Sequence, residues 1–162
     1  MTDPRADLGF PTGGVLLGID HGIKRIGVAL CDGARIITRP LLVIERTTRE
    51  AEFALLQGLI KKHQAVGIVV GLPLDVREAT AGNFTPESRT VRRWVSRLKA
   101  VVSIPVILWD ERFSSFEAES RAEAMGRDPN EPIDHWSAAV ILEDYLQAHH
   151  PAADPPTEPE PD

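Results

Sequence analysis

Two apolar runs joined by a short polar turn, between residues 14 and 32, constrain the fold of this chain more than any other feature. The runs read GVLLGID and RIGVALCD, and each has the length and composition of a β-strand. Because only the residues HGIK separate them, the two runs must pair as an antiparallel hairpin. The first run ends on Asp20, which is either a turn residue or the first ligand of an active site.

The rest of the chain alternates strand-like and helix-like patterns. The segment 34–45 predicts a third strand, in which Pro40 indicates an edge position or a bend. Short apolar runs at 65–73 and 104–112 predict strands that are covered on both faces of a sheet. Apolar residues at helical spacing, with capping residues at the ends, predict helices at 47–64, 86–102, 114–126 and 133–150.

The order β-β-β-α-β-α-β-α-α predicts an α/β fold. The expected architecture is a mixed five-stranded sheet, with three antiparallel strands followed by parallel strands and helices on both faces. Ligands of such sheets usually bind at the carboxyl ends of the strands, so functional residues are expected there.

The two ends of the chain differ in composition from its middle. Residues 1–13 hold acids and prolines without a hydrophobic block, and residues 149–162 are acidic and rich in proline. Segments of this kind bury too little apolar surface to order themselves. We therefore expect a disordered N-terminal extension at 1–13, one folded domain at 14–148 and a disordered tail at 149–162.

The net charge of −6 at first argues against a nucleic-acid partner. The tail, however, contains Asp154, Glu158, Glu160 and Asp162 and no lysine or arginine, and without these four the remaining 20 acids face 18 bases. The rest of the chain is therefore near −2, and overall charge does not decide whether the partner is a nucleic acid.

Hydropathy and cysteine content bear on location. No apolar run reaches the roughly 18 residues that a membrane span needs, so no membrane partner is expected. The single cysteine, Cys31, cannot form an internal disulfide, which makes a reducing cytoplasm the simplest location. Cys31 also lacks a second cysteine at the spacing of a zinc site.

Acidic residues stand at the positions where a site of this sheet is expected. Asp20 ends the first strand, Asp110 and Glu111 end the last strand, and Asp134 opens the final helix. Carboxylates that converge from separate elements bind Mg²⁺, which prefers oxygen ligands. Two such ions about 4 Å apart support phosphodiester cleavage. Their coincidence at converging positions predicts a metal-dependent active site.

Each of these acids also has a purely structural interpretation. Asp20 fits a turn, and Asp134, after a proline and an isoleucine, fits a helix N-cap. Asp110 and Glu111 fit a salt bridge with Arg112. Taken singly, none of the acids establishes a catalytic function.

Glycines and bases shape the predicted hairpin turn. Gly22 and Gly27 flank the residues IKRI, and as glycines they allow positive φ in the turn and close approach of the backbone. Lys24 and Arg25 then either meet a phosphate backbone or form a solvated tip.

The helix predicted at 86–102 carries Arg89, Arg93 and Arg97, which fall four apart on one face. Such a face is usually solvated, and the alternative is a stripe that contacts phosphates. The spacing alone leaves both interpretations open.

Four blocks carry a resemblance to a known family. GIDHGIKRIGVALCD, IVVGLPL, PVILWDERFSSFEAE and IDHWSAAVILEDYL resemble, in this order, the signature blocks of the YqgF family, and they cover nearly all of residues 15–147. Proteins of this family are described as pre-16S ribosomal RNA nucleases and as RuvX-type relatives of Holliday junction resolvases, with an RNase H-like fold. The resemblance implies hydrolysis of nucleic-acid phosphodiester bonds that depends on Mg²⁺, with Mn²⁺ as an alternative, in 5′-end maturation of small-subunit ribosomal RNA.

The resemblance also assigns residues. It implies that Asp20, Glu111 and Asp134 are the catalytic metal ligands, with Asp110 beside them as a further ligand. It implies that Lys24, Arg25 and Arg112 bind the substrate or support the site. In two places the chain departs from the family pattern. His21 stands where an aromatic residue or valine is common, and the loop 75–87 has Asp75 for an asparagine and extra length.

Other functions are compatible with the sequence. A four-way DNA junction is the alternative substrate, and because a junction resolvase needs two active sites, the chain is either a monomer or a homodimer. A non-catalytic factor that binds ribosomal RNA or transcription complexes is a further alternative. Actin-like ATPases and sugar kinases open on a similar hairpin but enclose their nucleotide between two domains, for which this chain is short. A serine hydrolase is not indicated, because no GxSxG sequence is present.

Overall fold

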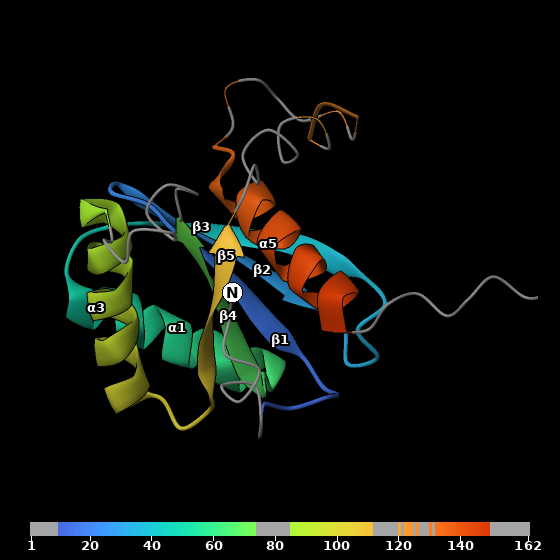
Figure 1. Cartoon of the computed structure of the whole chain (residues 1–162), viewed down its shortest axis with the longest axis horizontal. Helices are drawn as coiled ribbons and strands as arrows, with labels where there is room; N and C mark the ends of the chain where they lie inside the picture. Colours follow the sequence, from blue (N-terminus) through green and yellow to red (C-terminus); the bar gives the residue numbers. More distant parts are fainter. Residues whose placement is uncertain are drawn as a thin grey trace, which may run out of the picture.

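The computed structural model describes residues 10–73, 85–111 and 132–149 together with isolated positions between 120 and 130, and at residue 111 it describes the backbone only. Helices lie on both sides of a central sheet, with α1 and α3 to one side and α5 to the other (Figure 1). The elements are β1 (Leu16–His21), β2 (Arg25–Cys31), β3 (Thr38–Glu45), α1 (Arg49–His63), β4 (Gly67–Pro73), α3 (Pro86–Val101), β5 (Val106–Glu111) and α5 (Asp134–His149).

The sheet has five strands in the order β3-β2-β1-β4-β5. The pairs β1–β2 and β2–β3 are antiparallel, whereas β1–β4 and β4–β5 are parallel. This arrangement confirms the predicted mixed α/β sheet. The helix predicted at 114–126 falls mostly outside the described residues.

The third strand lies at an edge of the sheet, as its proline predicted. Pro40 pairs with Ala29, and the register of β2 and β3 shifts between Val28 and Ala29. A proline lacks the N–H that a central strand would need, so an edge strand with a local irregularity is the place that tolerates it.

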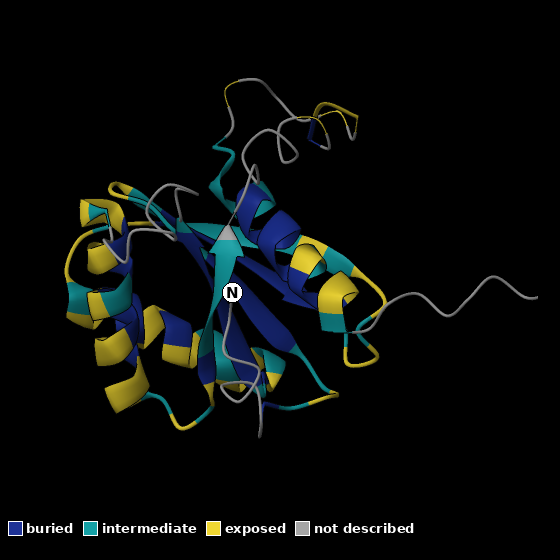
Figure 2. Cartoon of the chain, viewed as in Figure 1, coloured by how far each residue is buried: buried dark blue, intermediate teal, exposed yellow. Residues whose placement is uncertain are grey.

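Two hydrophobic cores lie on the two faces of the sheet. Side chains of β1, β2, β4 and β5 pack with those of α1 and α3 on one face, and a second set packs with α5 on the other. Figure 2 shows the buried residues concentrated on the inner strands and on the helix surfaces that face them. No helix in the described ranges combines the length and the hydropathy that crossing a membrane requires.

Threonine side chains begin both helices of the first face. Thr48 accepts a hydrogen bond from the N–H of Ala51 at 3.2 Å, and Thr85 accepts one from Ser88 at 3.1 Å. Thr48 is therefore the N-cap of α1. Each cap satisfies an N–H group that the first helical turn leaves without an intrahelical partner.

Of the predicted N-terminal extension, the structure describes residues 10–13. Phe10 is buried, and its ring packs edge-on against Tyr145 of α5 at a centroid distance of 5.7 Å. Gly67 makes this possible, since a Cβ atom there would lie 2.7 Å from the Phe10 ring. At the other end α5 includes His149, whose ring stacks on Tyr145 at 4.1 Å, one residue into the predicted tail.

Candidate active site

The alternation of side chains along β1 decides which face Asp20 occupies. Leu17 and Ile19 belong to the core beneath α1 and α3, whereas Leu16 belongs to the core beneath α5. Because successive residues of a strand face opposite sides, Asp20 lies on the face covered by α5, and His21 lies on the other.

The start of α5 lies directly against β2 beside Asp20. A Cβ atom at Gly27 would overlap the carbonyl oxygen of Asp134, and one at Gly18 would lie 2.8 Å from the carbonyl oxygen of Ala138. Asp20 pairs with Gly27 across the hairpin. Since side chains of such partners emerge about 5 Å apart on the same face, Asp20 and Asp134 are neighbours.

Close approach, rather than an unusual backbone, explains the two glycines of the hairpin. Neither Gly22 nor Gly27 uses the positive φ that a glycine allows, since the described glycines with positive φ are Gly14 and Gly126. The N–H of Gly22 donates to the carbonyl oxygen of Arg25 at 2.9 Å, and a Cβ atom at Gly22 would lie 2.6 Å from that oxygen. The predicted close approach is therefore confirmed at both positions.

Arg25 binds one of the candidate ligands. Its Nε donates to Oδ2 of Asp134 at 3.1 Å, with 40% of the Arg25 side chain and 18% of the Asp134 side chain exposed. A partly exposed pair of this kind contributes little to stability, but it fixes the orientation of the carboxylate. Lys24, at the tip of the turn, is exposed and lies next to Ile23, which is 87% exposed.

On β5 the two adjacent acids lie on opposite faces. Val106 and Leu108 belong to the core beneath α1 and α3, whereas Ile107 and Trp109 belong to the α5 side. By alternation the backbone of β5 directs Asp110 toward the first face and position 111 toward the α5 face.

Position 111 therefore shares a face with Asp20. Gly71 of β4 follows Val70, the strand partner of Ile19, so it lies between β1 and β5. As a glycine, it has no side chain on the α5 face that Asp20 and position 111 share. The side chain of Glu111 and all of Arg112 lie outside the described residues. The alternation separates Asp110 from Asp20 and Asp134.

The described donors fit part of a metal site. Within the described ranges, no group of three or more histidine, cysteine, aspartate or glutamate side chains stands close enough to hold a metal ion. The backbone of Asp134 contacts Gly27, the strand partner of Asp20, and the hard oxygen atoms of the two carboxylates suit an ion such as Mg²⁺, which retains several waters.

A buried polar cluster beneath the turn is a feature that the sequence reasoning missed. Glu52 of α1 is 2% exposed, and it accepts hydrogen bonds from Nε1 of Trp94 at 3.2 Å and from Nε of Arg46 at 3.1 Å. Arg46 also donates to the carbonyl oxygen of Gly22 at 3.0 Å. The cluster ties the hairpin turn to α1 and α3. Its signal in the sequence was a glutamate four residues before the buried Leu56, on the apolar face of its helix.

His21 belongs to this cluster and not to the site beside it. Its ring packs against Trp94 with the centroids 4.8 Å apart. Burial, assisted by the positive charge of Arg46 and opposed by Glu52, lowers the pKa of His21 from 6.5 to about 4. The His21 imidazole is neutral, and it lies on the face of β1 opposite to Asp20, so it does not assist Asp20. Packing therefore explains the departure from the family pattern at position 21.

The low pKa of His21 predicts a pH-dependent loss of stability. Above pH 6.5 the folded and unfolded states both hold a neutral ring, whereas between 6.5 and about 4 only the unfolded state is protonated. Stability should therefore fall as the pH drops through this window, by about 1 to 2 kcal/mol at pH 5 after allowance for partial exposure. Urea unfolding in EDTA at pH 7 and pH 5 measures this loss, and His21→Gln should reduce it. An equal loss in both proteins would contradict the assignment.

The chain is similar in sequence to one family of proteins. A family model described as "RuvX: Holliday junction resolvase" matches residues 14–148. A protein of Thermoanaerobacter pseudethanolicus named "Putative pre-16S rRNA nuclease" is 34% identical over 137 residues, which cover 82% of this chain and 96% of that protein. A protein of the same name from Anaeromyxobacter sp. strain Fw109-5 is 38% identical and covers 83% and 97%.

Solved structures show the same fold at low identity. RuvC of T. thermophilus in complex with a Holliday junction substrate gives a TM-score of 0.55 at 15% identity, covering 84% of this chain and 95% of RuvC. The Fowlpox virus resolvase in complex with Holliday junction DNA gives 0.52 at 10% identity, covering 84% and 99%. These likenesses confirm the predicted RNase H-like architecture.

Proposed function

The chain belongs to the RuvX family, and from that premise we propose that it is a metal-dependent nuclease that hydrolyses phosphodiester bonds in the precursor of small-subunit ribosomal RNA. The observation that carries the proposal is the contact of the Asp134 backbone with Gly27, the strand partner of Asp20, on the α5 face at the carboxyl end of β1. Oxygen donors at this edge of a mixed α/β sheet occupy the position where such folds bind ligands.

Asp20, Glu111 and Asp134 are the proposed ligands of Mg²⁺, with Mn²⁺ as an alternative. When bound, such an ion supplies positive charge at the phosphate and lowers the pKa of a bound water. Asp110 is left out of the set because alternation along β5 turns it toward the opposite face.

The remaining residues of the turn support the site. Asp20 and Asp134 are neighbouring carboxylates, and like charges at short range repel. The guanidinium of Arg25, 3.1 Å from Asp134, offsets that repulsion and holds the carboxylate in place. Lys24 is exposed at the tip of the same turn, where it is available to a phosphate of the substrate, and Arg112 is proposed for the same role.

A four-way DNA junction is the second candidate substrate, favoured by the family description and by the fold that the chain shares with RuvC. That reaction would require two sites, and so a homodimer, whereas a single cut in RNA requires one. A nucleic-acid partner is common to both candidates. With precursor ribosomal RNA as its substrate, the protein is proposed to act in the cytoplasm.

A parallel cleavage assay tests the proposal. Precursor ribosomal RNA and a synthetic four-way junction are incubated with the protein, each with Mg²⁺ and with EDTA, and RNA that lacks the 5′ leader is the control. We expect cleavage of the precursor near its mature 5′ end, with Mg²⁺ only. Cleavage of the junction alone would replace the RNA substrate, and binding of either nucleic acid without cleavage would favour a non-catalytic factor.

A further inference from the structure

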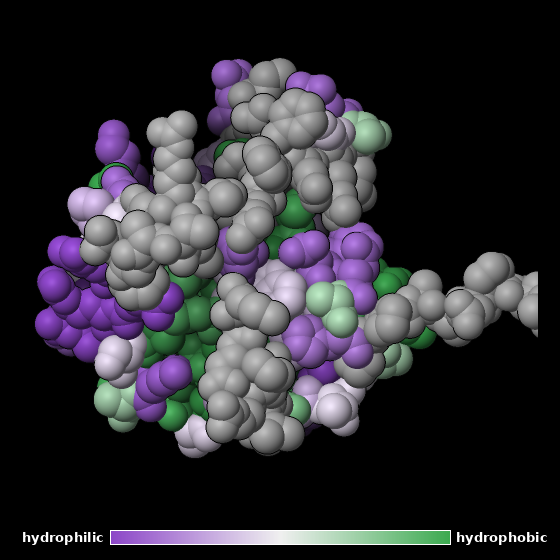
Figure 3. Space-filling view, viewed as in Figure 1, coloured by the Kyte–Doolittle hydropathy of each residue, from purple (hydrophilic) through white to green (hydrophobic). Residues whose placement is uncertain are grey.

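Helix α3 is strongly basic in an acidic chain. Its residues Pro86–Val101 include one acid, Glu87, and five cations, Arg89, Arg92, Arg93, Arg97 and Lys99, whereas the whole chain has a net charge of −6. Figure 3 shows strongly hydrophilic residues over the position of α3. The charge of α3 is therefore opposite to that of the molecule.

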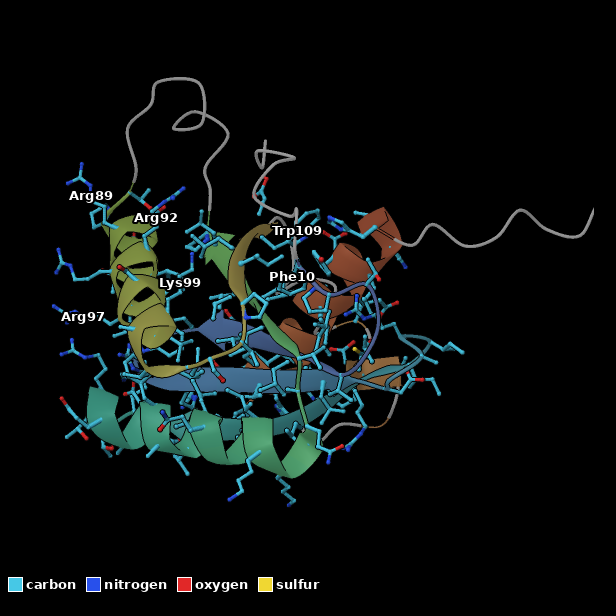
Figure 4. All side chains as sticks on the ribbon, turned by 90° about the horizontal axis from the view of Figure 1, so that it is seen from below. Phe10, Arg89, Arg92, Arg97, Lys99 and Trp109 are labelled. Atoms are coloured by element: carbon cyan, nitrogen blue, oxygen red, sulfur yellow. The ribbon has the colours of Figure 1, made fainter. Side chains whose placement is uncertain are left out.

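The cations cover the solvent face of the helix. Trp94, Val95 and Leu98 are among the residues that face the core. Residues four apart advance about 40° around a helix, so Arg89, Arg93 and Arg97 follow one another along the opposite side. All three are exposed, and Arg89 and Arg97 point away from the sheet (Figure 4). In the described ranges none of the three forms a salt bridge.

Helix stability does not account for this pattern. Like charges four apart on a helix repel, and each such pair costs a few tenths of a kcal/mol. The solvated face of α1 shows the usual alternative, since acids occupy its first turn and bases its last turn. A row of unpaired arginines is therefore better explained by a ligand that carries several negative charges.

The row lies at the edge of the sheet where β1 ends, on the face opposite to the proposed nuclease site. Trp94, in the middle of α3, packs against His21, the residue that follows Asp20. Arg97, at the far end of the row, borders a groove between α1 and α3 that also contains Arg49 and Glu50.

We propose that Arg89, Arg93 and Arg97 form a phosphate-binding surface that holds the backbone of the nucleic acid outside the active site; this inference rests on the proposed nuclease function. The three arginines span about 12 Å of helix, which matches the rise of three to four nucleotides at about 3.4 Å each. Exposed guanidinium groups recognise the backbone and not the bases, so this surface should add affinity without adding sequence preference.

Binding as a function of salt tests the surface apart from catalysis. The triple variant R89Q/R93Q/R97Q is compared with wild type for binding to precursor ribosomal RNA in EDTA, where cleavage is blocked. We expect affinity to fall about tenfold at low salt, and the slope of log K against log salt to decrease by about 2 to 3. The variant R39Q/K61Q/K62Q, which removes three exposed cations of β3 and α1, is the matched control and should change both quantities little.

The outcomes separate this inference from the proposed function. Equal losses in the two triple variants, or an unchanged slope in R89Q/R93Q/R97Q, would overturn the phosphate surface while leaving cleavage by the wild type intact. Wild-type protein that binds the RNA but cleaves nothing would overturn the nuclease and leave the surface to be judged by its slope. Urea midpoints near that of the wild type would show that both variants are folded.

Discussion

Replacing Asp20 by asparagine should reduce cleavage by at least about a hundredfold, because a metal ligand supplies several kcal/mol of transition-state stabilisation and each 1.36 kcal/mol is a factor of ten. The fold should survive, since asparagine is isosteric with aspartate and the substitution removes one of two neighbouring like charges. Cleavage is measured on precursor ribosomal RNA at saturating Mg²⁺. A variant that cleaves at the wild-type rate would remove Asp20 from the site.

A second readout does not depend on activity. If Asp20 is a ligand, Mg²⁺ or Mn²⁺ should raise the melting temperature of the wild type, by an amount that corresponds to about 2.7 kcal/mol at a concentration of 100 times Kd. The same ion should raise the melting temperature of Asp20→Asn much less. Asp32→Asn is the matched control. Asp32 follows β2 at the opposite end of the hairpin, and its Oδ1 accepts from the N–H groups of Ile36 and Ile37 at 2.8 Å, a role that an asparagine oxygen retains.

The order of the elements was predictable because the patterns that define them are local. Alternating apolar runs, threonine caps and helical spacing each act within about ten residues, and they gave the hairpin, the edge strand with Pro40 and the helices α1, α3 and α5. The packing of Phe10 was not predictable in the same way. It depends on a space above Gly67, which is remote from Phe10 in the sequence.

The candidate site was predictable only in part. Asp20 and Asp134 were recognisable at a strand end and a helix start. The faces of the sheet toward which positions 110 and 111 are directed depend on the register of β5, and the local sequence WDER does not determine that register. The sequence also left the role of His21 open. Its surroundings, Trp94, Arg46 and Glu52, come from α3, from the loop after β3 and from α1.

The function of Gly27 illustrates the same limit. Its position in a turn-like sequence suggested an unusual φ, whereas its actual role is to leave room for a helix that begins more than a hundred residues later. A local pattern identifies that a glycine is required, and only the tertiary contact identifies why. The distinction matters because it changes the expected effect of a substitution from local strain to displacement of Asp134.

Gly27→Ala should therefore destabilise the protein by about 3 kcal/mol, near the upper end of the cost of overpacking, because the added methyl group would overlap the backbone of Asp134. The atoms that the methyl group would overlap belong to the backbone and not to the flexible end of a side chain, so removing the overlap requires α5 to move as a unit. The free energy of unfolding from urea titration measures the effect. Gly58→Ala is the matched control: Gly58 lies within α1, nothing stands within 4 Å of its added Cβ, and alanine there should stabilise by about 0.5 to 1 kcal/mol.

The same substitution links packing to the proposed chemistry. Moving the start of α5 away from β2 would separate Asp134 from Asp20, so the folded fraction of Gly27→Ala should also bind Mg²⁺ or Mn²⁺ more weakly. The stabilisation of the folded state by each ion should be smaller in Gly27→Ala than in the wild type, and it should be unchanged in Gly58→Ala. It is measured at temperatures below the melting transition of the variant. If Gly27→Ala lost stability but kept the full response to the ion, Asp134 would not be a ligand, and the close contact would serve the fold alone.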